Sequence, residues 1–202
     1  MQFLPVKRAL LSVTDKTGLA DLAGFLAERN VEIVSTGGTA ALIREHGIPV
    51  TGVSDVTGFP EILGGRVKTL HPRVHGGVLA DKDDPSHEQT LDEHDIDFFD
   101  LVCVNLYDFA AAVTANAELK PAVEKIDIGG PTLLRAAAKN FHSVCVLPDP
   151  EFYASFMTQF EDTGKISLDF RLKTARYTFD LTSRYDRMIT DYLSRKQVED
   201  SD

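Results

Sequence analysis

The first 150 residues alternate between short apolar runs and helical patterns. A continuous apolar run is typical of a buried strand, and apolar residues three and four positions apart are typical of a helix. The pattern predicts strands at 8–13, 31–34, 49–53, 101–106 and 143–147, and helices at 19–26, 40–46, 86–94 and 131–140. This repeated order of strand and helix favours an α/β fold of three layers, with a mainly parallel sheet covered by helices on both faces.

Residues with known preferences for helix ends mark several of these boundaries. Thr14 and Asp15 are good caps for the first helix. Ser86 and Gln89 have the spacing of a capping box at the start of the third helix. Pro131 suits the first turn of the fourth helix, because the missing N–H of proline has no partner to lose there.

From Ser167 to Lys196 the pattern becomes that of one long amphipathic helix, with room for a single break. Its apolar stripe consists of Leu172, Ala175, Phe179, Tyr185, Met188, Ile189 and Tyr192. We expect this stripe to pack on the sheet, with docking against a partner as the alternative. The chain then forms a single domain, with a core at 1–150, a helical C-terminal segment at 151–196 and a frayed polar tail at 197–202.

Composition narrows the choice of ligand. The 202 residues are 43% hydrophobic and carry a formal net charge of −10, which disfavours a nucleic-acid binder. Lysines and arginines inside glycine-rich loops instead favour a local pocket for a small anion. The N-terminus does not resemble a signal peptide, and no apolar run approaches the roughly 20 residues that span a bilayer. We therefore expect a cytoplasmic protein without membrane contact, with Cys103 and Cys145 buried and reduced.

Four polar segments fall where strands should end, and open parallel sheets bind ligands at that edge. They are SVTDKTG at 12–18, STGGT at 35–39, GGRVKTLHP at 64–72 and IDIGGPT at 126–132. The first leads a strand into a helix N-terminus beside Lys16, an arrangement that suits a phosphate. A plain capped turn is the alternative there. The glycines of the second allow a close approach of the backbone to a ligand.

The third and fourth segments carry candidate chemistry. Arg66 and Lys68 would point the same way in an extended chain, so that one grips a phosphate and the other serves the reaction. His71 and His75 could form a pair of metal ligands. The proline between them disfavours one continuous helix that holds both, so we expect no metal site. Asp127 precedes two glycines, which favours a pocket role over a structural cap.

Six stretches, taken together and in order, closely resemble the IMP cyclohydrolase domain, the N-terminal half of AICAR transformylase/IMP cyclohydrolase. They are LLSVTDKTGL, STGGTA, TGFPEILGGRVKTLHP, HGGVLA, VNLYDF and IDIGGPTLLRAAAKN. The resemblance covers nearly the whole chain. It implies a fold similar to methylglyoxal synthase, and the dehydrative ring closure of 5-formamidoimidazole-4-carboxamide ribonucleotide (FAICAR) to IMP, the last step of de novo purine biosynthesis. No cofactor is implied.

The same resemblance implies the residues of the site. The catalytic positions match Lys68, Tyr107, Asp127 and Lys139. Positions that contact the nucleotide match Ser12, Lys16, Ser35, Gly37, Gly38, Thr39, Arg66 and Thr69, and the part facing the base matches Asn105, Gly129 and Gly130. Lysines 68 and 139, with the two glycine amides, are the candidates for stabilising the departing oxygen. The sequence leaves the acid and base roles open.

The chain departs from the family in two ways. Asp108 stands where the family usually has proline, and the chain ends at Asp202, where the family normally continues into the transformylase domain. A stand-alone enzyme and a fragment both stay open, as do a homodimer and a fused or separate transformylase. The rival interpretations are a ligand-sensing module on the same fold and methylglyoxal synthase itself. The four catalytic candidates favour the cyclohydrolase over the first, and GGRVKTLHP over the second.

Overall fold

The computed structural model describes residues 1–107, 109 and 118–196. Asp108 and the tail expected at 197–202 therefore lie outside the described residues. Within these ranges, no helix is both long and apolar enough to cross a membrane. Both cysteines are buried and free, and burial raises the pKa of the Cys103 thiol to about 12.

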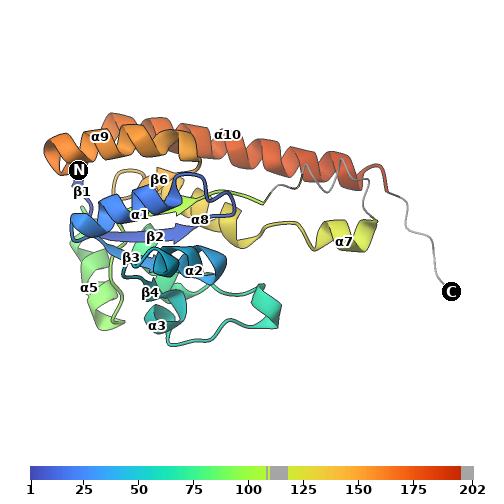
Figure 1. Cartoon of the computed structure of the whole chain (residues 1–202), viewed down its shortest axis with the longest axis horizontal. Coiled ribbons are helices and arrows are strands. Elements are labelled where there is room, and N and C mark those ends of the chain that lie inside the picture. The colour runs from blue at the N-terminus through green and yellow to red at the C-terminus, as the bar shows by residue number, and fades with distance from the viewer. Residues whose placement is uncertain (108, 110–117, 197–202) are drawn as a thin grey trace.

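A five-stranded sheet forms the centre of the molecule (Figure 1). Its strands are β2 (Arg8–Ser12), β3 (Glu32–Ser35), β4 (Thr51–Gly52), β5 (Leu101–Val104) and β6 (Cys145–Leu147). They run in the order β4-β3-β2-β5-β6, and every neighbouring pair is parallel. The predicted parallel sheet is thus confirmed. The third strand is shorter than predicted, because a helix already begins at Val53.

Alternating side chains divide the core into two halves, one on each face of the sheet. In β5, Leu101 and Cys103 face one half, and Val102 and Val104 face the other. The first half is covered by α1 (Leu19–Glu28), α2 (Gly37–Glu45) and α9 (Tyr153–Thr163). The second half is covered by α3 (Val53–Thr57), α4 (Pro72–Leu79) and α8 (Gly129–Lys139). The three predicted layers are present.

Shorter elements complete the described chain. They are β1 (Phe3–Pro5), η1 (Leu63–Gly65), α5 (Pro85–Glu93), α7 (Leu119–Val123), η2 (Pro150–Phe152) and β7 (Lys165–Ser167). The predicted capping box at the start of α5 is wrong. Asp84 caps this helix instead, since its carboxylate accepts a hydrogen bond from the backbone N–H of Ser86 at 2.9 Å and Pro85 fills the first position.

Two helices begin earlier than the pattern predicted. Helix α2 begins at Gly37 rather than Ala40, and α8 begins at Gly129 rather than Pro131. Glycine is a poor helix former, so helical periodicity does not detect a first turn made of glycines. Both predicted glycine loops are therefore first turns of helices, with their backbone N–H groups at the sheet edge.

The C-terminal helix α10 (Leu168–Leu193) is unbroken and packs against α8 (Figure 1). The apolar stripe predicted for it is only partly correct, because Phe179 is 40% exposed. Threonines take its place on the buried face: Thr174, Thr178 and Thr182 are fully or almost fully buried. Their hydroxyls donate to backbone carbonyls one turn earlier, so small polar residues pack against α8 without losing hydrogen bonds.

The N-terminal strand lies against the segment that leads into α10. Strand β1 pairs with β7 in a separate antiparallel ladder. Arg171 of α10 is fully buried and donates to the carbonyls of Met1 at 2.6 Å and Phe141 at 2.8 Å, and also to that of His142. A buried guanidinium needs such acceptors, and here they tie the N-terminus to the segment before β6.

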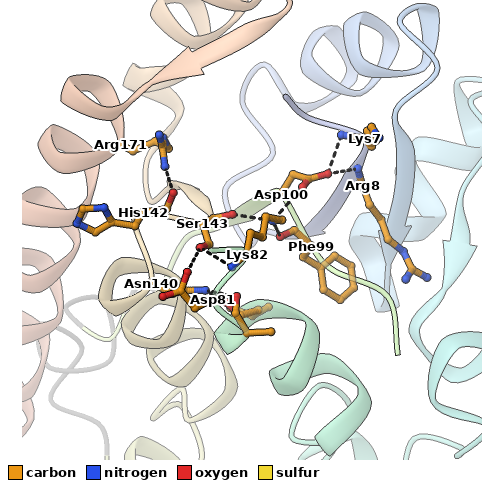
Figure 2. Close-up of polar contacts among 12 residues, drawn as sticks. Lys7, Arg8, Asp81, Lys82, Phe99, Asp100, Asn140, His142, Ser143 and Arg171 are labelled. Atoms are coloured by element: carbon orange, nitrogen blue, oxygen red, sulfur yellow. Dashed lines mark hydrogen bonds and ion pairs between the residues drawn. The ribbon is translucent and has the colours of Figure 1, made fainter. Parts of the chain in front are cut away.

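A buried ion pair fastens the amino ends of the central strands (Figure 2). The ammonium of Lys82 lies 3.0 Å from Asp100 and donates to the carbonyl of Ser143 at 2.6 Å. The other carboxylate oxygen of Asp100 accepts from the backbone N–H groups of Lys7 and Arg8. Burial lowers the pKa of Lys82, and the Asp100 carboxylate offsets part of that shift.

Replacing Asp100 with alanine should destabilise the fold by about 3–5 kcal/mol, because the change leaves a buried ammonium and two N–H groups without their acceptor. Asp180→Ala is the control, since its pair with Arg184 at 2.9 Å joins side chains that are 66% and 61% exposed. That change should cost less than about 1 kcal/mol. Urea unfolding followed by circular dichroism measures both. Equal losses would contradict the role of the buried pair.

Candidate active site

Most of the predicted site residues lie at the carboxyl edge of the sheet, where the chain leaves β2 and β5 in opposite directions. Helix α1 leads from β2 to β3 on one side, and β5 pairs with β6 on the other. Such a switch point is where open parallel sheets bind ligands. Asn105 bridges it: its side chain accepts from the N–H groups of Thr14 at 2.6 Å and Asp15 at 3.1 Å, and donates to the carbonyl of Asp15 at 2.9 Å.

Two further predicted contact residues also bond to the backbone. The hydroxyl of Ser35 donates to the carbonyl of Leu11 at 2.7 Å. The hydroxyl of Thr39 donates to the carbonyl of Val13 and accepts from its N–H, both at 3.0 Å. Both side chains are buried. Ser35 joins the end of β3 to β2, and Thr39 joins the start of α2 to the loop after β2. Ser12 ends β2 and is half-buried.

Two lysines flank the start of α2. A Cβ atom added to Gly38 would lie 3.8 Å from the ammonium of Lys16, and one added to Gly37 would lie 3.5 Å from that of Lys68. Among the described residues, no side chain caps the first turn of this helix. Two cations and uncapped backbone N–H groups thus meet at one exposed point, which suits a phosphate.

The segment at 58–71 carries Lys68 and Arg66, and the expectation that both point the same way is wrong. Arg66 has a helical backbone (φ −69°, ψ −26°) rather than an extended one. Its guanidinium pairs with Glu124 at the end of α7. Lys68 instead pairs with Glu61 at 3.1 Å. Of Arg66 and Lys68, only Lys68 therefore reaches the start of α2 in this arrangement.

Glycine at position 65 makes the pair between Lys68 and Glu61 possible. Gly65 has φ +92°, and an added Cβ would lie 2.7 Å from a carboxylate oxygen of Glu61 and 2.9 Å from Cε of Lys68. Sequence reasoning missed Glu61 because no periodicity links it to Lys68. Its presence within the specific stretch TGFPEILGGRVKTLHP was the available signal.

Asp127 lies at the start of α8 in a cradle of backbone amides. Its carboxylate accepts from the N–H of Gly130 at 2.9 Å, and the N–H groups of Tyr107 and Gly129 also contribute. Burial raises the pKa of this carboxyl, and the amides offset part of the shift. A Cβ at Gly130 would lie 2.4 Å from the carboxylate, so only glycine fits there. The two glycine amides face Asp127 rather than an open oxyanion site.

Tyr107, Thr69 and Lys139 have different positions relative to Asp127. Tyr107 is 52% exposed, and its backbone N–H donates to the carboxylate of Asp127. Thr69 is buried, with its hydroxyl 3.4 Å from a Cβ added at Gly129. Lys139 lies at the opposite end of α8, an 11-residue helix that is about 16 Å long. The structure thus brings Tyr107 and Asp127 together, places Lys68 beside the start of α2, and leaves Lys139 at the far end of α8.

The two histidines have structural positions. His71 caps α4, its Nδ1 accepting from the backbone N–H of Arg73 at 3.2 Å, and His75 lies within that helix. Burial lowers the pKa of His75. In the part of the chain that the structure describes, no three His, Cys, Asp or Glu side chains form a group that would hold a metal ion.

A cavity of about 300 Å³ adjoins this edge, and Asp15, Asn105 and Tyr107 line it together with Tyr185 of α10. A second cavity, of about 810 Å³, lies between η2 and α10 and contains none of the predicted site residues. Size alone would favour the second. The cations, backbone amides and half-buried carboxyl at the sheet edge favour the site beside the first cavity.

Fold and site thus define a parallel α/β domain with a candidate anion site at its switch point. Residues 18–132 match the model of the MGS-like domain, and residues 137–202 match that of the AICARFT/IMPCHase bienzyme. The chain therefore belongs to the MGS-like domain family.

Individual relatives agree with this assignment. Over 94% of its own length, this chain is 49% identical to "Bifunctional purine biosynthesis protein PurH" of Neisseria meningitidis. Over 91% of its own length, it is 52% identical to the protein of that name from Rippkaea orientalis. It spans only 36% of the length of each. Among solved structures, "Crystal structure of ForH" superposes with a TM-score of 0.80 at 34% identity, covering 93% of this chain and 99% of ForH.

Lys16→Ala should weaken the binding of ribose 5-phosphate about tenfold or more, since a charge-assisted hydrogen bond contributes about 1.5–3 kcal/mol. Calorimetric titration measures the affinity. Lys165→Ala removes the same charge from β7, in the other sheet, and should leave binding unchanged. A similar loss in both variants would indicate an effect of net charge rather than a site at the start of α2.

Proposed function

We propose that this chain is an IMP cyclohydrolase, which closes the ring of FAICAR to form IMP and water. The observation that carries the proposal is the setting of Asp127: a half-buried carboxyl with a raised pKa, held by amides beside Tyr107. The match of the C-terminal residues to the AICARFT/IMPCHase bienzyme and the identity with the PurH proteins support it.

The start of α2 is the proposed phosphate site. Lys16 and the exposed N–H groups of Gly37 and Gly38 supply a cation and helix-terminal donors there. The phosphate does not change during ring closure, so these groups contribute equally to the ground and transition states and act mainly on KM. Arg66 joins this site only after leaving Glu124, and we assign it to substrate affinity as well.

Ring closure joins two groups of one molecule, so positioning supplies much of the rate. The carboxamide nitrogen attacks the formyl carbon and loses a proton as the new C–N bond forms. The formamido nitrogen then gives up a second proton as the ring C=N bond forms, and the formyl oxygen takes up two protons and leaves as water. Asp127 is the proposed acceptor of the amide proton, because a raised pKa makes a carboxylate a stronger base.

Lys68 and Tyr107 are the proposed partners of the formyl oxygen. Lys68 brings a positive charge to the edge, where a nearby cation stabilises charge that develops on an oxygen, and its ammonium is also the proposed donor of a proton to that oxygen. The exposed hydroxyl of Tyr107 is suited to pass a proton to the departing oxygen. The proposed reaction uses no metal or cofactor. Lys139 stays a prediction from the resemblance alone.

The proposed substrate also defines partners and location. FAICAR is the product of a formyl transfer, so a transformylase domain, fused or separate, must act before this one. The name of the bienzyme model and the word bifunctional in the names of the PurH relatives support that partner. A charged ribonucleotide does not cross membranes unaided, and we therefore place the protein in the cytoplasm.

The chain alone should convert FAICAR to IMP without folate, and EDTA should not reduce the rate. Absorbance during turnover, with IMP identified by chromatography, measures the reaction. A folded sample that binds IMP without turning over FAICAR would contradict the proposal and favour a ligand-sensing module.

Lys68→Ala should lower kcat by about 10²–10⁴-fold, the usual contribution of a general acid or base, and should change IMP affinity much less. Lys68→Arg should restore little activity, because a guanidinium keeps the charge but does not readily give up a proton. Steady-state kinetics and IMP titration test both variants. Normal kcat in the arginine variant would show that Lys68 contributes only its charge. Normal kcat in the alanine variant would show that Lys68 takes no part in the reaction.

A further inference from the structure

The C-terminal half of α10 packs against the two segments that carry Tyr107 and Asp127. Phe109, Ala122, Tyr185 and Tyr192 form a small buried cluster, and Leu106 and Ile126 pack against it. Leu106 precedes Tyr107 and Ile126 precedes Asp127 in the chain. The cluster therefore fixes both candidate residues relative to α10, a helix that also packs against α8.

Tyr185 adds a polar contact at the centre of this cluster. The backbone N–H of Asp127 donates to the Tyr185 hydroxyl at 2.8 Å. The tyrosine ring meets Phe109 edge to face, with the ring centres 6.3 Å apart. Only 5% of Tyr185 is exposed, so water does not replace its hydroxyl unless the cluster opens.

We propose that Tyr185 is a positioning residue for ring closure and acts through Asp127. The aspartate is held at two points, its N–H by Tyr185 and its carboxylate by the N–H of Gly130. Without the first contact, the segment before α8 is free to rotate and to carry the carboxyl away from the substrate. The inference rests on the proposed function, because that function assigns the proton acceptor to Asp127.

If Tyr185 has this role, the C-terminal helix α10 is part of the active site. Tyr185 also lines the cavity of about 300 Å³ beside Asn105 and Tyr107, so α10 forms one wall of the site. Reactions between groups held in place depend steeply on geometry, and a displacement of about 1 Å is able to cost about 100-fold in rate. One hydroxyl on α10 therefore affects kcat without touching the phosphate.

Tyr185→Phe removes the hydroxyl and keeps the ring and its contact with Phe109. We expect kcat to fall by up to about tenfold, or about 1.4 kcal/mol, the upper end of what one hydrogen bond contributes, with KM and IMP affinity nearly unchanged. Tyr177→Phe is the matched control: it removes a hydroxyl of α10 that lies 3.4 Å from Asp149 and is not bonded to Asp127. Unchanged kcat in Tyr185→Phe, or an equal loss in the control, would overturn the proposal.

A double variant separates positioning from general destabilisation. If Tyr185 acts through the carboxyl of Asp127, adding Tyr185→Phe to Asp127→Asn should cause no further loss of kcat. A second tenfold loss in the double variant would show that Tyr185 acts elsewhere.

Hydrogen exchange tests the contact without activity. The amides of residues 126–130 should exchange faster in Tyr185→Phe than in the wild type and in Tyr177→Phe. Identical exchange in all three proteins would overturn the inference. A wild-type chain without turnover would overturn the proposed function, and exchange would then decide alone whether Tyr185 holds Asp127.

Discussion

The carboxyl edge of a parallel sheet leaves backbone N–H and carbonyl groups without strand partners, and every buried one must find a hydrogen bond. Here side chains provide them. Asn105 bonds to three backbone groups of the loop after β2, and Thr39 bonds to both groups of Val13. Asp127 does the same for the first turn of α8. The shape of the site depends on these bonds, because they set where each loop lies.

This constraint divides the site residues into two groups. Ser35, Thr39 and Asn105 direct their polar atoms to the backbone and influence a ligand through the loops they hold. Lys16 and Tyr107 are exposed and free to meet a ligand directly. Asp127 belongs to both groups, since the amides that cradle it also leave it poorly solvated. Rigid support and available chemistry thus come from different residues of the same motifs.

The sequence predicted the parallel sheet and the position of its edge, because apolar runs and helical periods are local signals. It did not predict first turns made of glycine at Gly37 and Gly129, since periodicity needs side chains. The threonine face of α10 was hidden because threonine counts as polar until its hydroxyl bonds within the helix. The contacts Glu61–Lys68 and Tyr185–Asp127 join distant parts of the chain, and no local pattern specifies them.

The clasp between Arg171 and the carbonyl of Met1 joins residues 170 positions apart. At synthesis rates of about 5–20 residues per second, the first strand leaves the ribosome roughly ten to thirty seconds before its partners. Strand β1 has no partner through that interval, because β7 and Arg171 are made near the end of the described chain. Its pairing therefore follows the synthesis of every strand of the five-stranded sheet.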